Sequence, residues 1–105
     1  MYEIETYVTP DDRRCPFDEW LERLDRKIQA RVEDRLDRVQ DGNFGDRRPV
    51  GDEVYELRLM FGAGYRIYFG IANGQVVLLL GGGSKKRQNR DIQDAKSCWA
   101  EFKSR

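Results

Sequence analysis

The chain has 105 residues, of which 39% are hydrophobic and 36% charged, the composition of a globular domain rather than a disordered segment. This length fits one domain spanning residues 1–105. No apolar run approaches the roughly 20 residues that a membrane span needs, and the N-terminus lacks a signal-peptide pattern, so we expect a cytoplasmic location without membrane contact. With no histidine and only two cysteines, the sequence offers neither a zinc site nor histidine acid–base catalysis, and we expect no metal or cofactor.

The formal net charge is zero, but charge is unevenly distributed along the chain. Residues 1–54 carry 10 Lys/Arg and 15 Asp/Glu, whereas residues 55–105 carry 9 Lys/Arg and 4 Asp/Glu. Chance alone can produce such an asymmetry in a short chain. The alternative is that the C-terminal half faces an anionic partner, because the distribution of charge governs association rather than fold.

The N-terminal part predicts a strand followed by a helical hairpin. Residues 2–9 alternate between apolar and polar side chains, as in a strand with one solvated face. Residues 16–41 carry apolar side chains at steps of three and four, which predicts helix. Asp25 is a potential N-cap, so we expect a break near residues 24–26. The charged face of the hairpin is interpreted as solvated surface, and residues 46–53 are expected to form a loop.

The C-terminal part predicts three strands and a helix. Residues 54–61 and 64–72 alternate and are joined by a short glycine loop. The Asn-Gly pair at 73–74 predicts a type I′ turn, and it leads into residues 76–80, which are apolar on both faces and therefore form a central strand. Residues 88–103 predict a helix. The order predicts an α+β fold: an N-terminal strand, a helical hairpin, a three-stranded antiparallel meander and a C-terminal helix, with the helices packed on one sheet face.

Strand alternation gathers four polar residues on the sheet face opposite the apolar stripe. Glu56 and Arg58 lie on this face of one strand, and Arg66 and Tyr68 on the same face of the next. With residues 61–63 as the loop, Arg58 lies directly opposite Arg66, and like charges in that position repel. Either Glu56 relieves the repulsion, or the two arginines await an anion such as phosphate, which a guanidinium matches with its planar fork.

A glycine-led basic segment follows the third strand. Gly81–Gly83 precede Lys85, Lys86, Arg87 and Arg90. By itself such a segment is usually a solvated loop. Because it emerges beside the strand that carries Arg66, we interpret it as a footprint for a phosphate backbone.

Five segments of the sequence are familiar in kind, order and spacing: Pro16-Phe17-Asp18-Glu19-Trp20-Leu21, Gly42-Asn43-Phe44-Gly45-Asp46 with Pro49-Val50-Gly51, Tyr55-Glu56-Leu57-Arg58, Gly62-Ala63-Gly64-Tyr65-Arg66-Ile67-Tyr68-Phe69, and Leu79-Leu80-Gly81-Gly82-Gly83-Ser84-Lys85. With them the chain resembles the RelE/ParE toxin superfamily. Within it, the resemblance is to the HigB-like addiction-module killer proteins, which are related to phage Gp49-like proteins. It covers nearly the whole chain.

The resemblance implies a RelE-like fold and a toxin of a type II toxin–antitoxin system. The usual activity would be ribosome-dependent cleavage of mRNA, which inhibits translation. The partner would be a helix-turn-helix antitoxin from the adjacent gene, and operator DNA would be contacted only through that antitoxin. The arginine of the family's Glu-Leu-Arg motif corresponds to Arg58, that of its Tyr-Arg-Ile-Tyr-Phe motif to Arg66, and the lysine after the glycines to Lys85.

In such an endoribonuclease the ribose 2′-OH attacks the adjacent phosphate. Arg58 and Arg66 would stabilise the developing charge, and Lys85, or else Tyr68, would transfer a proton. Lys86, Arg87 and Arg90 form the predicted RNA-binding set. Two alternatives stay open. A ParE-type gyrase poison without enzymatic activity fits the near-neutral pI of about 6.3, and a phage-derived remnant would only bind its antitoxin.

Overall fold

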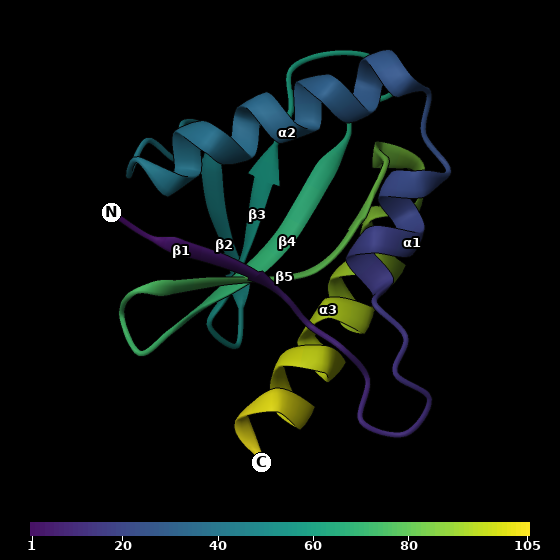
Figure 1. The fold of residues 1–105 in the computed structure, drawn as a ribbon. Helices are drawn as coiled ribbons and strands as arrows, with labels where there is room; N and C mark the ends of the chain where they lie inside the picture. The colour runs from purple at the N-terminus through teal and green to yellow at the C-terminus, as the bar shows by residue number, and fades with distance from the viewer.

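The computed structural model describes residues 1–105 and contains one five-stranded sheet and three α-helices (Figure 1). The elements are, in chain order, β1 (Glu3–Thr6), α1 (Pro16–Glu22), α2 (Arg26–Gln40), β2 (Arg47–Gly51), β3 (Val54–Arg58), β4 (Arg66–Ala72), β5 (Val76–Gly83), the short 3₁₀ helix η1 (Lys85–Arg87) and α3 (Gln88–Lys103). None of the helices combines the length and the hydropathy of a membrane span. The predicted α+β class is confirmed.

The strand order in the sheet is β1-β5-β4-β3-β2, with β1 parallel to β5 and the other pairs antiparallel. The antiparallel part therefore has four strands rather than the predicted three. The segment 46–53, expected to be a loop, contains the edge strand β2. It has no apolar alternation and includes Pro49, which an edge strand tolerates because one of its sides makes no ladder hydrogen bonds. Both features hid β2 from pattern analysis.

Helices cover both faces of the sheet, so the prediction that they share one face is wrong for α3 (Figure 1). The side chains of β5 alternate between two cores. Leu79 faces the core that contains Trp20 of α1, whereas Leu78 and Leu80 face the core that contains Trp99 of α3. A strand that is apolar on both faces must be covered on both, and α3 supplies the second cover.

Local signals in the helical hairpin and in the β4–β5 turn behave as predicted. The hairpin breaks where expected, with Asp25 as N-cap of α2 and its side chain accepting from the backbone N–H of Lys27 at 2.8 Å. Asn73 and Gly74 have φ values of 54° and 68°, as a type I′ turn requires. These contacts fix the direction of α2 and the pairing of β4 with β5.

The glycines after residue 80 stay within β5 instead of releasing the chain, as we had expected. A Cβ on Gly82 would lie 2.3 Å from the indole ring of Trp20, so glycine lets α1 approach the sheet. Gly70 does the same on the other face, where a Cβ would lie 2.4 Å from the ring of Trp99. Gly81 has nothing within 4 Å of its Cβ position. Glycine is thus used here for close packing.

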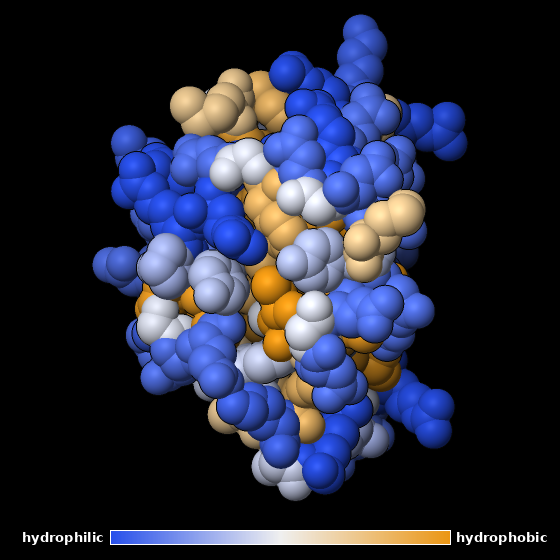
Figure 2. All heavy atoms as spheres, turned by 90° about the vertical axis from the view of Figure 1, so that its left-hand side faces the viewer, coloured by the Kyte–Doolittle hydropathy of each residue, from blue (hydrophilic) through white to orange (hydrophobic).

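The exposed surface is mainly hydrophilic. The face in Figure 2 shows polar residues over most of its area, with apolar atoms in a narrow band. The large hydrophobic side chains with substantial exposure are Met1, Val8 and Met60. Met60 lies in the segment that joins β3 to β4, and it is 82% exposed. This exposed methionine lies beside the charged residues described next.

Candidate functional site

Three of the predicted site residues meet in one cavity. Arg58 of β3 and Arg66 of β4 lie directly opposite each other, as the alternation predicts. On the other side of Arg66 lies Gly83 of β5, so the chain reaches Lys85 just after leaving the sheet there. The Lys85 N–H donates to the carbonyl of Ala63 at 3.4 Å, which holds the two loops together. Arg58, Arg66 and Lys85 line a cavity of about 290 Å³.

The other wall of this cavity, which we call the arginine cavity, comes from the segment between β3 and β4: Leu59, Met60, Phe61, Gly62, Gly64 and Tyr65. The rings of Phe61 and Tyr65 pack with their centroids 5.8 Å apart. Cations on one wall and aromatic side chains on the other suit a nucleotide, which presents a phosphate and a base. Tyr65 was assigned to the apolar stripe in the sequence, so its place in the cavity was missed.

Glu56 lies beneath the two arginines and joins them to α3. Its side chain is 3% exposed. One carboxylate oxygen lies 3.4 Å from Nε of Arg66 and 4.0 Å from Nε of Arg58. The other oxygen accepts from the side-chain amide of Gln88 at 2.8 Å and, more weakly, from the hydroxyl of Tyr68 at 3.5 Å. Glu56 therefore relieves the repulsion between the arginines while leaving both at the cavity.

Arg66 is buried, which alternation alone did not reveal. It is 4% exposed because α3 covers the face that the sequence suggested was open. Its Nη1 donates to the carbonyl of Gly64 at 2.8 Å, whereas its buried Nε has no hydrogen-bond partner despite the nearby Glu56 carboxylate. Buried donors are rarely left unpaired in proteins. The guanidinium is thus fixed in direction from two sides and keeps unused donor capacity.

Tyr68 does not reach the arginine cavity. It is fully buried and packs in the core under α3. Burial, followed by the neighbouring Glu56 carboxylate, raises the pKa of Tyr68 far above its usual value. A phenol in these surroundings stays protonated and cannot meet a substrate, so the structure gives the suggested proton-transfer role of Tyr68 no support.

The predicted RNA-binding residues lie beside the arginine cavity rather than in it. Lys86, Arg87 and Arg90 are exposed on η1 and the first turn of α3. Together with Lys85 they line a separate hollow of about 370 Å³ that contains no acidic residue. Lys85 is the residue shared by the two cavities. None of the four cations forms an ion pair, so their charge is available to an anion.

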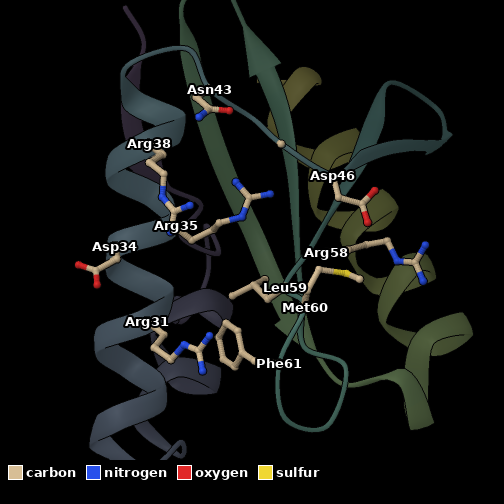
Figure 3. Close-up of a pocket in the computed structure, with 11 residues that line it drawn as sticks. Arg31, Asp34, Arg35, Arg38, Asn43, Asp46, Arg58, Leu59, Met60 and Phe61 are labelled. Atoms are coloured by element: carbon tan, nitrogen blue, oxygen red, sulfur yellow. The ribbon is translucent and has the colours of Figure 1, made fainter.

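A second cavity, missed in the sequence, lies between α2 and the end of β3 (Figure 3). Its volume is about 330 Å³, and Arg31, Arg35 and Arg38 of α2 line it together with Arg58. We call it the α2 groove. The spacing of the three arginines, i, i+4 and i+7, puts them on one helix face. That spacing was the available signal, but the acidic residues between them made the helix resemble ordinary solvated surface.

Comparison with known proteins places this architecture. The family model described as "Phage derived protein Gp49-like (DUF891)" matches residues 19–98, which include both cavities except for a few flanking positions. The chain belongs to the Gp49-like family. It is also 46% identical over 81 residues to an uncharacterized protein of Haemophilus influenzae (strain Rd), covering 76% of this chain and 82% of that one. The expected family membership is confirmed.

The fold of this Gp49-like protein matches that of RelE. A structure of a mutant of the E. coli toxin RelE in the free state superposes with a TM-score of 0.63 and 18% sequence identity. The match covers 90% of this chain and 93% of that one. The RelE-like fold predicted from the motifs is therefore confirmed, including the C-terminal helix packed on the sheet.

Proposed function

We propose that this Gp49-like protein is the toxin of a toxin–antitoxin pair and acts as a ribosome-dependent mRNA endoribonuclease. The observation that carries the proposal is the convergence of Arg58, Arg66 and Lys85 from three chain segments on one cavity. The RelE-like fold and the family membership support it. Fold alone does not decide between activities, so the argument rests on the chemistry of the cavity.

The cavity suits cleavage by internal transesterification. The ribose 2′-oxygen attacks the adjacent phosphorus, the bond to the 5′-oxygen breaks, and the products are a 2′,3′-cyclic phosphate and a 5′-hydroxyl. The phosphorane formed on the way carries more negative charge than the starting diester. Arg58 and Arg66, held in direction by Glu56, would stabilise that charge without reorganising.

Two proton transfers accompany this reaction, one from the 2′-hydroxyl and one to the leaving 5′-oxygen. Among the residues that line the cavity, Lys85 and Tyr65 carry exchangeable protons besides the arginines. Lys85 is the better candidate, because its ammonium lies beside the two guanidinium groups at the phosphate site. In-line positioning of the strand by the ribosome would supply much of the remaining rate.

The protein must be restrained in its host, and we propose that a helix-turn-helix antitoxin from the adjacent gene does so. The cation-lined cavities offer such a partner a surface for acidic side chains. Operator DNA would be contacted only through that antitoxin. The natural substrate would be mRNA on the ribosome, in keeping with the predicted basic segment after β5.

The test is addition of the purified protein to a cell-free translation reaction. Primer extension on the message then reveals whether discrete cuts appear on ribosome-bound mRNA, with Arg58→Ala as the inactive control. Inhibition of translation with new cuts supports the proposal. If translation proceeds normally while DNA gyrase supercoiling is inhibited, the gyrase-poison function takes its place.

A further inference from the structure

The α2 groove and the arginine cavity are adjoining parts of one surface. They share Arg58 and the segment Leu59–Phe61, which forms the floor of the first and a wall of the second. In Figure 3 Arg35 points from α2 toward the sheet, whereas Arg58 extends away from α2. Arg58 therefore stands between the two cavities, and an elongated ligand can pass from one into the other beside it.

The charge of the groove is not neutralised by the protein. Arg31, Arg35 and Arg38 form no ion pair within 4.0 Å. Two carboxylates, Asp34 and Asp46, also line the groove, but Asp34 points away from the sheet in Figure 3. Four guanidinium groups thus outnumber the carboxylates that could compensate them.

Arg35 is the most confined of these cations. Gly45 has a φ of 63°, and a Cβ there would lie 2.6 Å from Nη2 of Arg35, so glycine makes room for the guanidinium. Burial, and next the charge of Arg38, lower the pKa of Arg35 below its usual range. A cation held in partial burial beside another cation gains from an anionic ligand.

An apolar ridge borders the groove. Phe61 lies under the guanidinium of Arg31, whose Cζ is 3.9 Å from the ring centroid. Met60 next to it is 82% exposed. Cations that follow a backbone, together with exposed apolar and aromatic surface for bases, are the combination used by proteins that bind single strands.

We propose that the α2 groove binds the sugar–phosphate backbone of the same RNA strand, at nucleotides next to the one held in the arginine cavity. The inference rests on the proposed function and extends it to the flanking part of the substrate. The three arginines span seven residues of α2, about 10 Å along the helix axis, which is enough for more than one phosphate. The continuity with Arg58 and the ridge at Met60 favour RNA over an acidic peptide.

Equilibrium binding of 2′-O-methyl RNA, which cannot be cleaved, tests this without the ribosome. The probes are a trinucleotide and an octanucleotide of the same base composition. The test variant carries Arg31→Gln and Arg38→Gln, both at exposed positions, and Arg35 is left in place. The control carries Arg26→Gln and Arg48→Gln, two exposed arginines that line neither cavity, so both variants lose the same charge.

The wild type and the control should bind the octanucleotide more tightly than the trinucleotide. The test variant should lose about tenfold in octanucleotide affinity, bind the trinucleotide unchanged, and show a plot of log affinity against log salt that is shallower by about 1.4 for two lost phosphate contacts. Equal losses in the test and control variants would refute the inference, since they would reflect net charge alone. So would unchanged RNA binding with weakened binding of a poly-glutamate peptide, which would identify a protein-binding groove.

The outcome is separable from that of the proposed function. Loss of octanucleotide binding in the test variant supports the groove even if the wild type makes no cuts on the ribosome. Conversely, if the wild type cuts mRNA and the test variant binds both probes like wild type, cleavage stands and the groove assignment falls. Melting temperatures of the two variants should agree with that of the wild type, because all four positions are exposed.

Discussion

Replacing Arg66 with alanine should strongly destabilise the fold, apart from any effect on activity. The side chains of Arg66 and Glu56 are 5% and 3% exposed, so the mutation leaves a buried carboxylate without its nearest cation. Removing one partner of a buried pair costs about 3–5 kcal/mol. Glu56 keeps its hydrogen bond from Gln88 and the contact with Arg58 at 4.0 Å, which favours the lower end of that range. A loss of about 3 kcal/mol lowers the melting temperature of a domain this size by more than about 10 °C.

Thermal unfolding followed by circular dichroism measures this loss, and a second mutation shows its cause. Adding Glu56→Gln to Arg66→Ala removes the uncompensated charge while an amide can still accept from Gln88. The double variant should therefore melt at a higher temperature than Arg66→Ala alone. If Arg66→Ala melts within about 2 °C of the wild type, the electrostatic account of this pair is wrong. If it unfolds as expected, loss of toxicity in Arg66→Ala cannot be assigned to catalysis.

Three further outcomes are expected. Arg58→Ala should reduce mRNA cleavage about 10²–10³-fold yet cost no more than about 1 kcal/mol of stability, because the side chain is 29% exposed and distant from its carboxylate; a normally folded variant that cleaves like wild type would remove Arg58 from the catalytic set. Gly82→Ala should destabilise by about 1–3 kcal/mol through overlap with the indole packed on it, whereas Gly81→Ala, which has open space, should be near neutral in chemical denaturation. Burial and the hydrogen bond to Glu101 raise the pKa of Tyr7 from 10.0 to about 12, so folding favours the neutral phenol and stability should fall as pH rises from 10 toward 12; Tyr7→Phe should weaken that fall in melts across this range, and an unchanged pH profile would contradict it.

The alternation of the two central strands was enough to predict the register of the site. A side-chain period of two and a short glycine loop place Arg58 opposite Arg66, and the structure has the same pairing. Alternation identifies the side of a sheet but says nothing about what covers it. For that reason the burial of Arg66 and Tyr68 under α3 was not predicted.

The position of α3 had a signal that the sequence analysis used only in part. Residues 76–80 are apolar on both faces, which we took to mean a central strand. A strand in the middle of a sheet can still have one face in water, as in many antiparallel sheets. Apolar side chains on both faces require two layers of cover, and the stripe of α3, with Trp99 at its centre, is the element left over after α1 and α2 are placed.

The α2 groove shows why the uneven charge along the chain was a misleading guide. Arg31, Arg35 and Arg38 belong to the half that carries excess acid, so counting charges by sequence assigned the anion-binding role to the other half alone. In the fold, the end of β3 brings Arg58 to the same groove as α2, and the cations of both halves adjoin. The acids between the arginines lie at other angles around the helix, as Asp34 does in Figure 3. A chain with zero net charge can therefore present a continuous cationic path, because segregation around a helix axis and across a strand end does not appear in a sum along the sequence.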